Sequence, residues 1–298
     1  MSRVHDALRR AEQTGAPQPA SQNAPPAPPS GAGKPAPSPA TQAFCLDDVQ
    51  EVTFAPAHEA LLIDVSRPQD SPSEEFRSLR TRLNHLQSLQ PIHTVVVTSP
   101  SPAEGKSFSA ANLALAESQM KGNLTLLCDF DFRRPAMHNL FQIERSPGAT
   151  DYLLGQAPLA ACMKRVAGSS LYLMPAGSTV KNPLELLNLK EAKSLLQELP
   201  KTFNWVILDS PPLLFSADAN LLGTLTDGTI LVIRIGSTTI DTVHRAMQSL
   251  CENNVLGLVV NGARAGELYS KYTYYYSKYG YGEKESEPEE PLPPEEET

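Results

Sequence analysis

The sequence lacks the features that mark secreted, membrane-spanning or metal-binding proteins. Its four cysteines lie far apart, and none has a Cys-x-x-Cys or His-paired spacing, so neither a disulfide framework nor a zinc site is indicated. No apolar run approaches the roughly 18 residues that a membrane-spanning helix needs, and residues 1–15 lack the apolar core of a signal peptide. We therefore expect a cytoplasmic chain that does not itself cross a membrane, with reduced, mostly buried thiols at Cys45, Cys128, Cys162 and Cys251.

The sequence also lacks an excess of positive charge. The formal net charge is -8, and residues 283–298 account for most of it because they hold eight glutamates and one lysine, which leaves about -1 for the rest. Nucleic-acid binding requires a basic face. We expect no nucleic-acid partner.

Tyrosine is nearly absent from the first 268 residues, which contain only Tyr152 and Tyr172. The other seven fall within thirteen residues, at Tyr269, Tyr272, Tyr274, Tyr275, Tyr276, Tyr279 and Tyr281. A sticky, low-complexity end is one explanation for such a cluster. The chemistry of the preceding domain decides whether a functional explanation is better.

Composition divides the chain into five parts. With 298 residues, of which 41% are hydrophobic, the chain has room for one large α/β domain and its tails. Proline and alanine dominate the second part, which we interpret as an extended spacer. The parts are a short N-terminal helix (1–14), a Pro/Ala-rich linker (15–45), the folded domain (46–265), the tyrosine cluster (266–282) and an acidic disordered tail (283–298).

Six short runs rich in Val, Ile and Leu alternate with helical patterns within the domain. Continuous apolar runs of this kind are typical of strands buried on both faces, as in a parallel sheet covered by helices. We therefore predict an open, doubly wound, mostly parallel α/β sheet, which binds ligands at the carboxyl ends of its strands. The runs cover residues 94–99, 124–129, 171–176, 205–210, 229–235 and 256–261.

A helix is predicted from about residue 71 to 89. Ser71, Pro72 and Glu74 form a capping-box pattern with proline at the first helical position. An apolar stripe follows at helical spacing, made of Phe76, Leu79, Leu83 and Leu86.

The same helix carries Glu74, Arg77 and Arg80 three residues apart, along one side. One interpretation is an ordinary intrahelical ladder of charges. The other is a contact with a second subunit. Spacing alone favours the ladder.

A strand-to-helix turn at residues 100–107 reads PSPAEGKS. Gly-Lys-Ser in such a turn suits a P-loop, in which backbone N–H groups cradle phosphates, Lys106 reaches the β and γ phosphates and Ser107 ligates Mg²⁺. The full P-loop pattern has glycine where this chain has Pro100.

Acidic residues follow two of the predicted strands. Asp129 stands at the end of the second run and Asp131 follows it within CDFDFRRP, and Asp209 stands near the end of the fourth run within ILDSPP. An aspartate after a buried strand is the Walker B arrangement, which holds Mg²⁺ directly or through water. Together with Gly-Lys-Ser on one sheet, these residues predict a magnesium–nucleotide site.

The order of these motifs resembles that of the deviant-Walker ATPases and, among them, the bacterial tyrosine kinases of capsule and exopolysaccharide export. The resemblance covers roughly residues 70–282 and includes the Glu-x-x-Arg-x-x-Arg helix, LLCDFDFRRP, VILDSPP and the tyrosine cluster. Pro100 and Ala103 depart from the usual loop. The resemblance implies a P-loop fold like that of the MinD and ParA ATPases, with ATP as substrate and Mg²⁺ as cofactor.

The resemblance also implies site roles. Lys106 would be catalytic, Asp129 would be the candidate base, and Ser107, Asp131 and Asp209 would organise Mg²⁺, although the sequence does not choose between Asp129 and Asp131 as base. The nucleotide contacts would come from Ala103, Glu104, Gly105, Lys106, Ser107, Phe108, Arg133 and Asn261. Arg133 could instead form a salt bridge, Asn261 could be a turn residue, and Asp218 could be a switch residue or a helix cap.

The implied activity is tyrosine autophosphorylation, in which the cluster of one subunit enters the site of its neighbour in a ring held through Glu74, Arg77 and Arg80. The implied partners are a transmembrane polysaccharide co-polymerase of the Wzz type, which would recruit the chain to the inner face of the membrane, and a protein tyrosine phosphatase. A positioning ATPase of the MinD/ParA type is the main alternative, although the position of its signature lysine is Ser101 here. A pseudo-kinase scaffold is the other.

Overall fold

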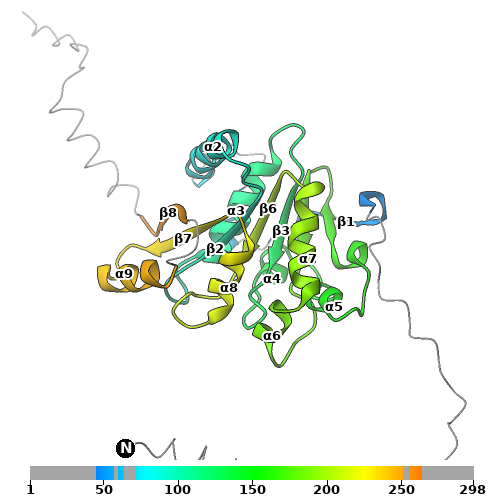
Figure 1. Ribbon diagram of the computed structural model, residues 1–298. Coiled ribbons are helices and arrows are strands. Elements are labelled where there is room, and N and C mark those ends of the chain that lie inside the picture. Colours follow the sequence, from blue (N-terminus) through cyan, green and yellow to red (C-terminus); the bar gives the residue numbers. More distant parts are fainter. Residues whose placement is uncertain (1–44, 57–59, 64–71, 251–254, 264–298) are drawn as a thin grey trace, which may run out of the picture. The chain divides into compact units, whose positions relative to one another are not determined.

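The computed structural model describes residues 45–56, 60–63, 72–250 and 255–263 (Figure 1). The N-terminal helix predicted at 1–14, all of the linker except Cys45, the tyrosine cluster at 266–282 and the acidic tail lie outside these ranges. The domain boundaries therefore stay predictions. Among the described residues, no helix is both long and apolar enough to cross a bilayer.

An eight-stranded sheet forms the centre of the fold, in the order β1-β4-β5-β3-β6-β2-β7-β8. Every neighbouring pair is parallel except β4 and β5, which run antiparallel. The mostly parallel sheet predicted from the apolar runs is therefore confirmed. The strands are β1 (Gln50–Val52), β2 (Thr94–Thr98), β3 (Thr125–Asp129), β4 (Lys164–Val166), β5 (Leu171–Met174), β6 (Trp205–Asp209), β7 (Gly228–Arg234) and β8 (Val255–Asn261).

Strands β1 and β4 were not predicted. Each has three residues, Gln-Glu-Val and Lys-Arg-Val, so neither contains an apolar run that could announce a strand. They pair with each other in parallel and extend the sheet beyond β5. Backbone pairing along this edge, rather than side-chain pattern, makes these segments strands.

Helices cover both faces of the sheet (Figure 1). Alternate strand residues point into two separate cores: Val96 and Leu208 pack with α5 to α8 on one face, and Val97 and Ile207 pack with α2 to α4 on the other. The chain is therefore doubly wound, as predicted. The helices are α2 (Ser73–Leu89), α3 (Lys106–Ser118), α4 (Met137–Leu140), α5 (Ala149–Leu153), α6 (Pro183–Leu187), α7 (Lys190–Glu198), α8 (Ala217–Leu225) and α9 (Ile240–Ser249), with 3-10 turns η1 (Leu46–Asp48), η3 (Leu159–Cys162) and η4 (Leu199–Lys201).

The prediction that strands are buried on both faces is confirmed for β2, β3, β5 and β6, whose residues are all buried. It is wrong for β8, which is the last strand of the sheet and leaves Leu258 and Val260 about half exposed. An edge strand has a neighbour on one side only, and helices do not cover its whole length. The apolar run therefore indicated the strand but not its place at the edge.

Helix α2 confirms the predicted apolar stripe, since Phe76 and Leu83 are buried and Leu79 and Leu86 pack beside them. The start of the helix differs from the prediction. The helix begins at Ser73, and Pro72 is its N-cap residue without a side-chain hydrogen bond. Proline therefore stands one position earlier than expected, which is within the usual uncertainty of helix boundaries.

Candidate functional site

The loop between β2 and α3 has the backbone of a phosphate-binding turn. Gly105 precedes the helix with a φ of 98°, and Ala103 also has a positive φ, of 63°. Glycine adopts this conformation without steric cost, whereas alanine pays for it. Helix α3 starts directly at Lys106, so its first N–H groups face the end of the sheet and favour an anion there.

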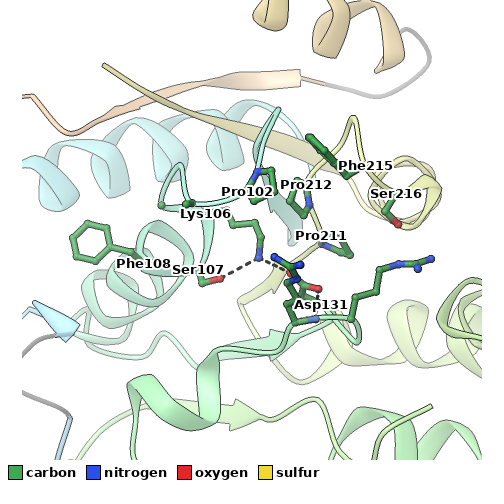
Figure 2. Close-up of a pocket in the computed structure, with 13 residues that line it drawn as sticks. Pro102, Lys106, Ser107, Phe108, Asp131, Pro211, Pro212, Phe215 and Ser216 are labelled. Carbon is green, nitrogen blue, oxygen red and sulfur yellow. Dashed lines mark hydrogen bonds and ion pairs between the residues drawn. The ribbon is translucent and has the colours of Figure 1, made fainter. Parts of the chain in front are cut away.

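Lys106 is the centre of the site (Figure 2). Its ammonium nitrogen Nζ lies 2.7 Å from Asp131 Oδ2, 3.4 Å from Asp209 Oδ1 and 3.2 Å from Ser107 Oγ. Burial by itself would lower the pKa of Lys106, but the charges of Asp209 and Asp131 outweigh it and raise that pKa. The lysine is therefore charged, and it neutralises two carboxylates that would otherwise repel each other.

The two strand-end aspartates lie side by side, because Asp129 of β3 pairs in register with Asp209 of β6. Asp129 accepts hydrogen bonds from the backbone N–H groups of Asp131, Ala136 and Met137. Burial and the charge of Asp209 raise the pKa of Asp129 to about 7. Asp129 therefore holds the loop after β3, and it is fully buried.

Asp209 has an unused oxygen. Its Oδ2 atom is buried and has no hydrogen-bond partner among the described residues. Burial raises the pKa of Asp209, and the nearby charge of Lys106 opposes that shift. A buried carboxylate oxygen without a partner is costly unless a cation or a donor meets it.

The donor set suits Mg²⁺, a hard cation that prefers oxygen ligands and retains several waters. Ser107, Asp131 and Asp209 supply a hydroxyl and two carboxylates around one point, and Asp209 Oδ2 is free to accept a bond. No group of three or more His, Cys, Asp or Glu side chains with metal-binding geometry occurs within the described ranges. The residues therefore fit an ion held partly by protein and partly by phosphate and water.

A pocket of about 580 Å³ opens beside Lys106 (Figure 2). Phe108 lies at one end of the labelled set, and Pro211, Pro212 and Phe215 lie on the opposite side of the lysine. Sequence reasoning had placed seven of the lining residues in the site: Ala103, Gly105, Lys106, Ser107, Phe108, Asp131 and Arg133. It missed the other six: Pro102, Arg134, Pro211, Pro212, Phe215 and Ser216.

The missed residues come from three loops, and Arg134 lies in the loop between β3 and α4. Pro102 belongs to the P-loop, and Pro211 to Ser216 follow β6 directly. Phe215 is 68% exposed although it lines the pocket. An aromatic residue six positions after a strand-end aspartate was a usable signal, because both are delivered to the same end of the sheet.

Four of the predicted residues do not line the pocket: Glu104, Asp129, Asp209 and Asn261. Glu104 is 1% exposed, so its carboxylate is not available to a ligand in this structure. The amide nitrogen of Asn261 donates to the Glu104 carbonyl at 3.0 Å. Asn261 therefore contacts the P-loop itself in this structure.

Arg133 forms the salt bridge that was one of its two interpretations. Its Nε lies 2.7 Å from Asp218 Oδ2 and its second guanidinium contact is 3.2 Å from Oδ1, while the arginine still lines the pocket. Asp218 is 1% exposed. Ser216 caps α8 through the Asp218 N–H, so the Asp218 carboxylate is an ion-pair partner rather than a helix cap.

The intrahelical ladder of charges expected along α2 is only partly present. Arg77 lies 3.4 Å from Glu74, and Glu74 is 70% exposed. Arg80 instead donates to the Ala116 carbonyl near the end of α3, at 2.8 Å. Glu74 and Arg77 therefore lie on the surface, whereas Arg80 joins two helices of the same chain.

No protein-family model matches the chain. A search of curated proteins finds the tyrosine-protein kinase YwqD of Bacillus subtilis, 34% identical over 225 residues, an alignment that covers 75% of this chain and 94% of that protein. The chain belongs to the bacterial tyrosine kinase family. Family membership confirms both the resemblance of the motifs and the expected enzyme class, protein-tyrosine kinase.

The kinase is also 31% identical over 224 residues to the tyrosine-protein kinase wzc of Salmonella typhimurium, of whose length it spans only 31%. Among solved structures, the chimerical protein CapA2B2 matches with a TM-score of 0.64 and 28% identity, over 71% of this chain and 91% of that one. The kinase domain of Escherichia coli ETK matches with a TM-score of 0.62 and 30% identity, over 67% and 78%. These structures confirm the predicted fold of the kinase.

Proposed function

We propose that the chain is an ATP-dependent tyrosine autokinase that transfers the γ-phosphoryl group of ATP to tyrosines 269–281 of a neighbouring copy. The observation that carries the proposal is Lys106, held between Asp131 and Asp209 at the start of the P-loop helix. The deviant-Walker family of the chain supports nucleotide binding at this loop. The tyrosine cluster supplies acceptors in the same chain.

ATP would bind with its phosphates over the N-terminus of α3. Lys106 would then exchange its bond to Asp131 for the β and γ phosphates, which places positive charge where negative charge develops in transfer. Ser107, Asp131 and Asp209 would hold Mg²⁺, which when bound neutralises charge on the phosphates. Arg133, already oriented by Asp218, lies on the same pocket wall and can contact the phosphoryl group or the acceptor.

The acceptor phenol would enter on the side of Pro211, Pro212 and Phe215. An apolar, partly aromatic wall suits a tyrosine ring, and Phe215 is exposed enough to meet one. Of the two candidate bases, Asp131 lies on the pocket wall and Asp129 does not. We therefore assign contact with the phenol to Asp131, and we assign to Asp129 the role of holding the loop that carries it.

Transfer between copies requires an oligomer, and we propose a ring. Glu74 and Arg77 remain candidates for its contacts because both reach the surface of α2, whereas Arg80 is engaged with α3. Each phosphotyrosine adds about -1.5 to -2 charges. Several of them ahead of the acidic residues 283–298 would repel one another and open the ring.

The proposed role is control of capsule or exopolysaccharide polymerisation and export. It rests on the resemblance of the sequence motifs to the family, not on a described residue. The proposed partners are a transmembrane polysaccharide co-polymerase of the Wzz type, which would activate the kinase and recruit it to the inner face of the membrane, and a tyrosine phosphatase. Purified chain alone could therefore be less active than chain in its own cells.

The experiment is mass spectrometry of the chain isolated from its native cells, with phosphate mapped onto residues 269–281 beside a Lys106→Ala copy. We expect phosphotyrosine in the cluster of the first and none in the second. A cluster without phosphate in a chain that turns over ATP would refute the autokinase and favour a positioning ATPase of the MinD/ParA type. Sedimentation of the phosphorylated and unphosphorylated forms tests ring opening, which an unchanged coefficient would contradict.

A further inference from the structure

Glu104 is a buried acidic residue in the P-loop that the proposed mechanism does not use. The residue is 1% exposed. One carboxylate oxygen accepts from the backbone N–H of Ser101 at 2.8 Å, and the other accepts a short hydrogen bond from the hydroxyl of Thr238. A buried carboxylate needs such partners to be tolerated. One partner lies in the loop itself, and the other lies beyond the end of β7.

The backbone of the same loop is held from the same side. Asn261, the last residue of β8, donates its amide to the Glu104 carbonyl at 3.0 Å. Arg234, the last residue of β7, donates its guanidinium to the Ala103 carbonyl at 3.1 Å. Two consecutive carbonyl groups of the P-loop therefore point at the ends of β7 and β8.

Because peptide bonds are planar, these contacts also determine where the N–H groups of the same peptides point. In a trans peptide the C=O and the following N–H point in opposite directions. The only cis peptide bond among the described residues is Ser146–Pro147, so both P-loop peptides are trans. Fixing the carbonyls of Ala103 and Glu104 outward therefore turns the N–H groups of Glu104 and Gly105 the other way, toward the inside of the loop. Neither N–H has an acceptor among the described residues.

The anchoring side chains are themselves held in place. The Thr238 hydroxyl accepts from the Arg234 N–H at 2.8 Å through a lone pair, and it donates its single proton to Glu104. Asn261 Oδ1 accepts from Gly262 N–H at 2.8 Å, which orients its amide nitrogen toward the loop. The fit is tight, because a Cβ added at Gly105 would lie 1.9 Å from Asn261 Nδ2.

We propose that Glu104, Arg234, Thr238 and Asn261 form a P-loop anchor that aims two backbone N–H groups at the phosphates of the nucleotide. These residues are positioning residues, since they act through the loop backbone. The anchor rests on the proposed function only in taking ATP as the ligand. It gives Asn261 a different role from direct contact with the nucleotide, for example with its adenine, which the family resemblance implied.

The experiment measures binding of two ligands to the purified full chain with Mg²⁺: ATP and inorganic triphosphate, each displacing a fluorescent ADP. Triphosphate has no adenine, so it separates the two roles of Asn261. Asn261→Asp places an oxygen against the Glu104 carbonyl and reverses the attraction. We expect it to weaken both ligands by the same factor, about fivefold to thirtyfold, as the loss of one buried hydrogen bond predicts. Weakening of ATP alone would mean an adenine contact and would overturn the anchor.

Thr238 supplies the matched control pair, because it does not line the pocket. Thr238→Val removes the hydroxyl at nearly constant volume and should weaken both ligands, whereas Thr238→Ser keeps the hydroxyl and should restore them. The free energy of unfolding of each Thr238 variant, measured without nucleotide, shows whether weaker binding comes from the P-loop alone or from a loss of the whole fold. If Thr238→Val bound both ligands like the unmodified chain, the anchor would be wrong even if Asn261→Asp failed to fold.

Nucleotide binding does not require phosphoryl transfer, so the P-loop anchor and the autokinase can be refuted independently. A chain that binds ATP but carries no phosphotyrosine when isolated from its native cells would refute the autokinase and leave the anchor supported by the variants. Variants that bind both ligands normally in a chain that autophosphorylates would refute the anchor alone. A chain that bound neither ligand would overturn both.

Discussion

Replacing Glu117 with glutamine should change how stability depends on pH. Glu117 lies in α3, 0% exposed, and the amide of Asn84 donates to both of its oxygens at 3.1 and 2.9 Å. Trp205 Nε1 donates to Asn84 Oδ1 at 3.3 Å, which fixes the orientation of that amide. Burial raises the pKa of Glu117 from 4.5 to about 7, against the opposing effects of the Asn84 hydrogen bond and the charge of Arg80.

The sign follows from proton binding. Between about pH 4.5 and 7 the folded chain keeps a proton on Glu117 that the unfolded chain releases, so the free energy of unfolding falls as the pH rises through this window. Above pH 7 both states are ionised, and the loss is constant. With 1.36 kcal/mol per pKa unit, the loss from pH 5 to pH 8 is about 2.5 kcal/mol. Glu117→Gln has no such proton, so it should gain about that much relative to the unmodified chain.

The assay is urea unfolding of both proteins at pH 5, 6, 7 and 8, with the difference in unfolding free energy plotted against pH. Other groups, Asp129 among them, titrate in both proteins and cancel in the difference. Glu191→Gln, an exposed position on α7, is the matched control for the loss of one carboxylate. A flat difference for Glu117→Gln would refute the reasoning and place the pKa of Glu117 near its ordinary value.

Three further outcomes are expected. Lys106→Ala should abolish phosphotransfer and lower the free energy of unfolding by about 3 kcal/mol in urea, because it leaves buried carboxylates unpaired; equal stability would contradict the role of the lysine in neutralising them. Phe215→Ala should raise the KM for a peptide of residues 264–283 about twofold to tenfold and leave the KM for ATP unchanged, as the worth of one aromatic contact predicts. Phe108→Ala, on the opposite side of Lys106, should leave the KM for the peptide unchanged. If Phe108→Ala raised that KM and Phe215→Ala did not, the acceptor tyrosine would not enter beside Phe215. Asp218→Asn should cost about 2 kcal/mol of stability by removing the charge that holds Arg133, and Arg133→Gln should cost about as much if the pair is the cause.

From the sequence alone, the mostly parallel sheet, the order of its motifs and a resemblance to the family were predictable. Buried parallel strands need continuous apolar runs, and a phosphate-binding turn needs Gly-Lys-Ser at a strand end, so both leave marks in the linear order of residues. Register then brings Asp129 beside Asp209 without further information, because parallel strands end at the same edge. These features are local or follow from the pleated sheet, and six of the eight strands were predicted for that reason.

Which contacts each of these residues makes depends on the folded structure and was not predictable from the sequence. Asp129 and Asp131 look equivalent in CDFDFRRP, yet one is closed off by three backbone N–H groups and the other meets Lys106. Glu104 and Asn261 are predicted nucleotide contacts from the sequence, and in the structure the side chain of each forms a hydrogen bond to the P-loop backbone. Their partners lie as many as 157 positions away, so no local pattern encodes them. Which side chain faces a pocket depends on packing between distant segments, and the fold alone settles that.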